Sequence, residues 1–301
     1  MQQARVTVRA PAKINLFLRI TGRRPDGYHF LATWMQKVDL CDIIEMTPRA
    51  EGIDFRCEED GIPWDHNNLV YRAADLFIQA IRGRGDTPAF GVTIQLIKKI
   101  PVAAGLGGGS SDAAATLLAM NELFGFPLTS GELVALGMRL GADVPFFLAG
   151  HPAAFATGIG EVIQPVSPLH GYSILLVNPG FPVSTRWVYH TFALTENENT
   201  SNLASLQEYT VEGMGCGSSG AVIGPETVLV NDLETVTISR YPLIARLKDE
   251  LLQSGAAHAL MSGSGPTVFG LFADHREAEA CYATCRLRFA VSCLVAPVGK
   301  E

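Results

Sequence analysis

Hydrophobic and polar positions predict that the chain opens with strands. Residues 5–10 and 13–20 are rich in β-branched side chains, and their apolar positions follow the two-residue period of strands. A turn-rich loop over 22–29 follows, with Pro-Asp-Gly at its centre. Residues 33–46 are again strand-like, and we expect a break in this strand near Leu40–Asp42.

Helical periodicity begins later in the first half. Asn68 opens a stretch in which apolar residues up to Ala80 fall on one stripe of a helix. A strand over 91–100, a glycine-rich joint and a helix over 112–123 come next. The segment Thr129-Ser-Gly-Glu132 is a capping box that opens another helix.

A second half begins near Ala153 and ends in alternating strands and helices. The expected elements are a strand over 172–177, a helix over 184–194, a polar and then Gly/Ser-rich loop over 195–224, one long helix over 231–254, strands over 257–261 and 267–273, a helix from 275 and a strand over 289–297. The final strand–strand–helix–strand order indicates a split βαβ, ferredoxin-like half. We therefore expect an α+β protein of two domains.

Composition narrows the class of protein. The 301 residues are 48% hydrophobic, and no uninterrupted apolar run of 18 residues occurs, so we expect no membrane span. The start lacks a signal-peptide pattern, which favours the cytoplasm. The net charge is −7 and no Lys/Arg cluster is present, which argues against nucleic-acid binding. The six cysteines are scattered, and we interpret them as reduced packing residues.

The most informative motif is the run Pro101-Val-Ala-Ala-Gly-Leu-Gly-Gly-Gly-Ser-Ser-Asp-Ala-Ala-Ala115. It joins a predicted strand to a predicted helix, where unpaired N–H groups and the helix dipole favour an anion. A polyphosphate could approach the backbone closely, and a Cβ at Gly107 or Gly108 should obstruct it. The alternative is a flexible turn capped by Ser110 or Ser111. The run is not a Walker P-loop, because no Gly-Lys-Ser/Thr closes it. It is not a dinucleotide fingerprint either, because its glycine spacing differs and no strand with a ribose-binding acid follows at the expected distance.

Two polar residues interrupt an apolar strand. Lys13 and Asn15 are two residues apart, so their side chains share one face of the strand, with Phe17. The alternative to a functional pair is an ordinary solvated face.

Three further motifs could carry chemistry. Asp143 lies in Gly-Ala-Asp-Val-Pro, where it could cap a helix or accept the proton of an attacking hydroxyl. Ser262-Gly-Ser-Gly-Pro266 could be a tight hairpin or a backbone cradle for a substrate phosphate. Tyr28 and His29 could stack on a base or fix their own loop.

Together these motifs resemble the GHMP small-molecule kinase superfamily. The resemblance is carried by 11–18, 24–29, 105–114 and 141–147, and 231–234 and 262–266 fit as well. It implies a two-domain architecture, with an ATP-binding half over 1–155 like domain 2 of ribosomal protein S5 and a ferredoxin-like substrate-side half over 156–301. The glycine loop and Pro-Asp-Gly-Tyr-His point to the branch whose substrate is cytidine diphosphate methylerythritol.

The resemblance also implies roles for individual residues. Lys13 and Asp143 are expected to be catalytic. The residues expected to hold the ATP phosphates are Pro101, Val102, Ala103, Ala104, Gly105, Leu106, Gly107, Gly108, Gly109, Ser110 and Ser111. The residues expected to bind the substrate are Asn15, Tyr28, His29, Tyr189, Ser264 and Gly265. Transfer of the ATP γ-phosphoryl group to the 2-hydroxyl of methylerythritol is expected, with Mg²⁺ offsetting phosphate charge and few protein ligands to the metal.

Other functions on the same fold stay open at this point. They are another kinase of the superfamily, such as homoserine or mevalonate kinase, a catalytically inactive sugar-sensing regulator, and a diphosphate-dependent decarboxylase. Retention of both Lys13 and Asp143 argues against the regulator. We expect a small-molecule substrate, no nucleic-acid or membrane partner, and a monomer or homodimer.

Overall fold

The computed structural model describes residues 5–82, 84, 90–195, 227, 229–289 and 291–299. They fall into two compact units. Unit 1 lies within Met1–Ala12, Cys41–Ile100 and Gly107–Gly150, and unit 2 within Lys13–Leu40, Pro101–Leu106 and His151–Glu301. The long strands β1 (Val6–Arg23) and β2 (His29–Arg49) therefore contribute residues to both units.

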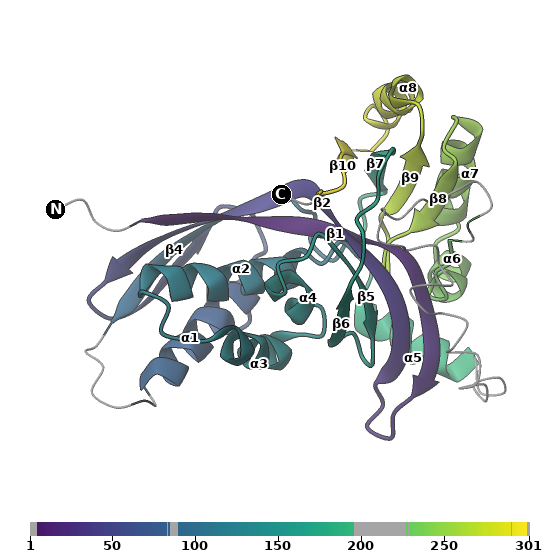
Figure 1. Cartoon of the computed structure of the whole chain (residues 1–301). Coiled ribbons are helices and arrows are strands. Elements are labelled where there is room, and N and C mark those ends of the chain that lie inside the picture. The colour runs from purple at the N-terminus through teal and green to yellow at the C-terminus, as the bar shows by residue number, and fades with distance from the viewer. Residues whose placement is uncertain are drawn as a thin grey trace. The chain divides into compact units, whose positions relative to one another are not determined.

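Unit 1 combines strands with helices. Its further elements are β3 (Gly52–Cys57), α1 (Leu69–Arg82), β4 (Gly91–Ile97), α2 (Gly108–Leu123), α3 (Ser130–Leu140) and α4 (Val144–Leu148). The second part of β2 pairs antiparallel with β4, and β4 pairs parallel with β3. Helices α1, α2 and α3 lie on one side of β4 (Figure 1).

Helix α2 lies at the centre of unit 1. Every residue from Ser111 to Leu117 is buried, so α2 has no solvated face in this stretch. Helix α1 packs against it and is amphipathic, with Val70, Ala73 and Phe77 on its buried stripe. The start of α2 is thus held on a rigid core.

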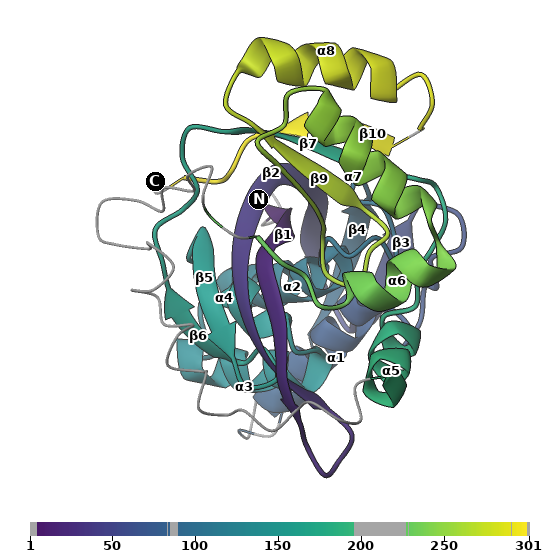
Figure 2. The same ribbon diagram turned by 90° about the vertical axis from the view of Figure 1, so that its right-hand side faces the viewer.

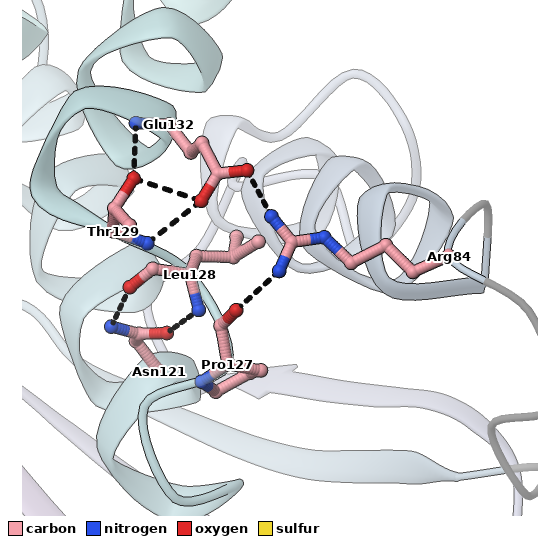
Figure 3. Close-up of polar contacts among 6 residues, drawn as sticks. All are labelled: Arg84, Asn121, Pro127, Leu128, Thr129 and Glu132. Carbon is pink, nitrogen blue, oxygen red and sulfur yellow. Dashed lines mark hydrogen bonds and ion pairs between the residues drawn. The ribbon is translucent and has the colours of Figure 1, made fainter.

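The predicted capping box at α3 is confirmed. The Thr129 hydroxyl accepts the backbone N–H of Glu132, and the Glu132 carboxylate accepts the backbone N–H of Thr129 at 2.8 Å (Figure 3). Arg84 pairs with the same carboxylate and donates to the carbonyl of Pro127. The Thr129 N–H first, and then the Arg84 and Thr129 side chains, lower the pKa of Glu132 to about 2.

Unit 2 holds two groups of strands. Its further elements are β5 (Ala153–Thr157), β6 (Val162–Pro165), β7 (Ser173–Asn178), α5 (Thr185–Thr195), α6 (Glu234–Arg240), α7 (Leu243–Gln253), β8 (His258–Met261), β9 (Val268–Phe272), α8 (His275–Cys285) and β10 (Val291–Val295). The first part of β2 pairs antiparallel with β5, and β5 pairs with β6.

The second sheet of unit 2 confirms the ferredoxin-like prediction. Its strand order is β10-β7-β9-β8, with every pair antiparallel. Helices α5 to α7 lie between β7 and β8 in the chain, and α8 lies between β9 and β10, which gives the βαββαβ order. Helices α7 and α8 cover one face of this sheet (Figure 2). The core between them includes Leu175, Leu247 and Phe272.

The structure corrects several secondary-structure predictions. Strand β2 continues through Asp42 without a break, since its pairing with β4 begins at Ile43, the next residue. The single helix predicted over 231–254 is two helices, since Pro242 follows Tyr241 and disfavours helical geometry there. Strands β3, β5 and β6 were not predicted.

Two other expectations can be compared with the structure only in part. Residues 196–224 of the predicted Gly/Ser-rich loop lie outside the described residues. Among the residues that the structure describes, no helix combines the length and the apolar character that crossing a bilayer requires.

Candidate functional site

The glycine loop enters α2 without a side-chain cap. Pro101–Leu106 belongs to unit 2, and the loop returns to unit 1 at Gly107. Gly107 is the N-cap residue, with φ 70° and ψ 14°, and no side chain caps the helix. The capping role considered for Ser110 and Ser111 is therefore wrong, because both lie inside the first turn. The first-turn N–H groups are then available to an anion.

The two glycine turns of the sequence are interlocked within unit 2. The Ser262 hydroxyl donates to the Gly105 carbonyl at 2.9 Å. A Cβ on Gly105 would lie 2.1 Å from the Ser262 carbonyl oxygen, and Gly105 has φ 76°, so only glycine fits there. Ala104 accepts the Thr267 N–H at 3.3 Å, which adds a second link. The first half of the loop is thus fixed by the second turn.

Lys13 and Asn15 are buried beside these turns, with 4% and 2% of their surface exposed. The Lys13 ammonium donates to Asn15 Oδ1, and Asn15 Nδ2 donates to Thr33 Oγ1 at 2.8 Å. A Cβ added to Gly263 would lie 3.5 Å from Lys13 Nζ. The solvated-face interpretation is therefore wrong. This chain of hydrogen bonds fixes a positive charge next to two backbone turns, an arrangement suited to a phosphate group.

Asp143 lies at the N-cap position of α4, with Pro145 in the first turn, as the sequence suggested. Its side chain makes no capping hydrogen bond, however. The turn that precedes Asp143 lies close to helix α2, since a Cβ on Gly141 would lie 3.7 Å from Ser110 Oγ. Within unit 1 the segment carrying Asp143 and the start of α2 are therefore neighbours.

Tyr28, His29 and Tyr189 come from one unit and differ in exposure. Tyr28 is 61% exposed, whereas His29 is buried with its ring 5.5 Å from that of Tyr189. His29 Nε2 is buried and has no hydrogen-bond partner among the described residues. Burial first, and then the charge of Arg23, lower the pKa of His29, which favours a neutral imidazole at pH 7. A neutral ring with an unpaired nitrogen suits a polar ligand.

The Ser262–Pro266 turn joins β8 to β9, so the hairpin interpretation is correct in form. Several partners that the sequence did not single out hold this turn. Asn231 Nδ2 donates to the Gly263 carbonyl at 2.7 Å, and Thr185 Oγ1 lies 2.8 Å from Ser264 Oγ. In the sequence, Asn231 belonged to the segment 231–234 that fits the family resemblance, but it had no predicted role. Thr185 lay in a predicted helix and had no predicted role either.

The exposed Gly109 offers a test of phosphate approach. A Cβ on Gly108 would meet Ile100 at 3.0 Å, so a substitution there disturbs the fold as well as any ligand. A Cβ on Gly109 meets only Leu69, at an ordinary 3.4 Å. We expect Gly109→Ala to raise the KM for ATP about tenfold or more, because the methyl group lies on the helix start, while the melting temperature is unchanged or higher.

Gly131→Ala is the matched control for this prediction. Gly131 lies in the first turn of α3, and a Cβ there meets nothing within 4 Å. It should affect stability similarly and leave the KM for ATP unchanged. An unaltered KM in Gly109→Ala would show that the phosphates do not approach this residue.

Comparison with known proteins places this loop and fold in a class. The model of the GHMP kinase N-terminal domain matches residues 68–151, and that of the GHMP kinase C-terminal domain matches 213–290. The chain belongs to the GHMP kinase family. It is a small-molecule kinase, and the family's phosphoryl donor is ATP.

Its relatives narrow this class further. The chain is 45% identical over 275 residues to 4-diphosphocytidyl-2-C-methyl-D-erythritol kinase of Geobacter metallireducens, covering 91% of this chain and 92% of the relative. It is 46% identical to the protein of the same name in Pelobacter propionicus, over 92% of this chain and 93% of the relative. A crystal structure of 4-(cytidine 5'-diphospho)-2C-methyl-D-erythritol kinase matches with a TM-score of 0.76 at 33% identity, over 98% of this chain and 100% of that one. Homoserine kinase of Cytophaga hutchinsonii, at 17% identity and TM-score 0.65 over 100% and 97% of the two chains, shares the fold.

Proposed function

We propose that this kinase transfers the γ-phosphoryl group of ATP to the 2-hydroxyl of 4-(cytidine 5'-diphospho)-2-C-methyl-D-erythritol, in non-mevalonate isoprenoid precursor biosynthesis. The observation that carries the proposal is the buried Lys13 ammonium, fixed by Asn15 beside two interlocked glycine turns. The names of the relatives, at 43–47% identity over most of the chain, supply the substrate.

Each catalytic group has a separate role in this proposal. Asp143 accepts the proton of the 2-hydroxyl group while the oxygen of that hydroxyl forms a bond to the γ-phosphorus of ATP. The bond between the γ-phosphorus and the β,γ-bridging oxygen breaks, and ADP is released. Lys13 stabilises the negative charge on the transferred group. The loop from Pro101 to Ser111 holds the ATP phosphates through its N–H groups.

The proposed substrate site uses neutral polar and aromatic groups. Tyr28, His29 and Tyr189 receive the cytidine, and the unpaired His29 Nε2 supports a hydrogen bond to it. Asn15 contributes beside Lys13, and the turn with Ser264 and Gly265 cradles a substrate phosphate.

Mg²⁺ and the organisation of the chain complete the proposal. Among the described residues no cluster of three or more His, Cys, Asp or Glu side chains could hold a metal. We propose a Mg²⁺ held mainly by nucleotide phosphate oxygens and water, where it would offset their charge. We also propose an ATP-binding half over 1–155 and a substrate-side half over 156–301, in a cytoplasmic monomer or homodimer.

A coupled ADP-release assay tests the substrate directly. A panel of hydroxyl substrates should include the proposed substrate, methylerythritol 4-phosphate without the cytidine group, homoserine and mevalonate. We expect efficient turnover only of the complete substrate. Equal turnover of the complete and truncated substrates would require another kinase activity of the same family.

Tyr28→Ala tests the cytidine contact. Stacking of a base on an aromatic ring contributes roughly 1–3 kcal/mol, so the KM for the complete substrate should rise about ten- to a hundredfold while the KM for ATP stays fixed. Tyr28→Phe is the control, because it keeps the ring. A normal substrate KM in Tyr28→Ala would remove this residue from the cytidine site.

A further inference from the structure

Three charged side chains are buried together in unit 1. Lys98 Nζ donates to a carboxylate oxygen of Asp42 and, at 2.8 Å, to Oδ2 of Asp112. The side chains of Lys98, Asp42 and Asp112 are 6%, 0% and 4% exposed. Two carboxylates share one ammonium group, so the cluster carries an uncompensated negative charge when both are ionised. Burial makes such a charge costly.

This Asp42–Lys98–Asp112 cluster lies under the start of α2. Asp42 Oδ1 accepts the backbone N–H groups of Lys99 and Ile100, the residues just before the glycine loop. A Cβ on Gly108 would lie only 3.4 Å from Lys98 Nζ. The Lys98–Asp112 ion pair therefore links the segment that follows β4 to the first part of helix α2.

Asp42 and Asp112 are bonded differently. Both oxygens of Asp42 accept hydrogen bonds, whereas Asp112 Oδ1 is buried and has no partner among the described residues. Burial raises the pKa of Asp112 to about 7, although the nearby Lys98 opposes the rise. Asp112 can thus gain or lose a proton near neutral pH.

The groups that pack around Asp112 from other elements are mostly apolar. Cys57, on β3, feels the charges of Lys98 and Asp112, and burial raises the pKa of its thiol. Asp143 is the carboxylate at the N-terminal end of α4. The buried faces of the helices that pack on α2 are otherwise apolar, with Val70, Ala73 and Phe77 on α1, Leu133 and Leu136 on α3, and Phe146 and Phe147 on α4.

We propose that Asp112 is a positioning residue for the nucleotide, which with Asp42 and Lys98 holds the start of α2 and gains a proton when ATP binds there. This inference rests on the proposed function of the loop. Bound phosphates add negative charge above the cluster, and protonation of Asp112 removes the uncompensated negative charge beneath them. ATP affinity therefore falls as the pH rises through the range in which Asp112 loses its proton.

Calorimetry at pH 8 tests the proposal with ATP and Mg²⁺ as the probe. Binding is measured in two buffers of different ionisation enthalpy, at a pH where the phosphates of free ATP are already ionised. The wild type should take up about half a proton per nucleotide, and Asp112→Asn should take up almost none. Between pH 6.5 and 9 the wild-type Kd should rise about three- to tenfold more than that of Asp112→Asn.

Cys57→Ser is the control, and it should keep the wild-type proton uptake. No uptake by the wild type, or equal uptake by Asp112→Asn, overturns the role of Asp112 while leaving ATP binding intact. No ATP binding by the wild type instead overturns the proposed function of the loop. If Asp112→Asn proves unfolded in a thermal melt, proton uptake at pH 8 is compared between the wild type and Cys57→Ser. Uptake by both supports the proposal, and no uptake by either overturns it.

Discussion

Asp143→Asn is expected to lower turnover by ~10²- to 10⁴-fold. The amide cannot accept the proton of the attacking hydroxyl, whereas size and shape are unchanged. Stability should stay close to that of the wild type, because asparagine fills the same space as aspartate and is an equally good N-cap residue. Steady-state kinetics with saturating substrates and a thermal melt measure the two quantities.

Asp274→Asn is the matched control for Asp143→Asn. Asp274 is also an N-cap aspartate, and its carboxylate does accept the N–H of Arg276, at 2.8 Å. Its substitution should leave turnover unchanged. Wild-type turnover in Asp143→Asn would remove the general base from the proposed mechanism.

Lys13→Met should lower turnover by ~10²- to 10³-fold. Methionine preserves most of the apolar stem and removes the ammonium group that Asn15 holds. The loss should fall mainly on kcat, because the charge of the transferred group is redistributed in the transition state. The KM values for ATP and substrate should change less.

Lys37→Met controls for loss of a buried lysine in the same unit. Lys37 is 7% exposed, and burial lowers its pKa to about 8. The turnover of this variant should stay within a few-fold of the wild type. Similar losses in both variants would point to packing instead of charge stabilisation.

Local signals in the sequence were sufficient for much of the fold. The capping box at Thr129 and the strand–strand–helix–strand order at the end of the chain each depend on residues close in sequence. The helix predicted over 231–254 was wrong because apolar periodicity continues across Pro242. Strand β6 is four residues long and largely exposed, so its sequence lacks the alternation that marks a half-buried strand.

The candidate site was predictable only where its residues are neighbours in sequence. The two-residue spacing of Lys13 and Asn15 predicted a shared face, which the structure confirms. The contact of Gly105 with Ser262 spans 157 residues, and no local pattern encodes it. Asp42 was interpreted as a strand break, and Lys98 as part of a strand end, since nothing in either segment indicates a buried partner.

Within unit 2, segments from the first half of the sequence bond to segments from the second half, and cutting the chain between them would break these contacts. Leu18 pairs with Asn231, and Ala104 and Gly105 bond to the segment from Ser262 to Thr267. A polypeptide cut near residue 155 would separate these partners, leaving strand β1 and the first glycine turn to expose apolar and backbone polar groups to water. Autonomous folding of either fragment is therefore disfavoured. Reassociation of the two fragments could restore these contacts, which makes the chain a candidate for fragment complementation.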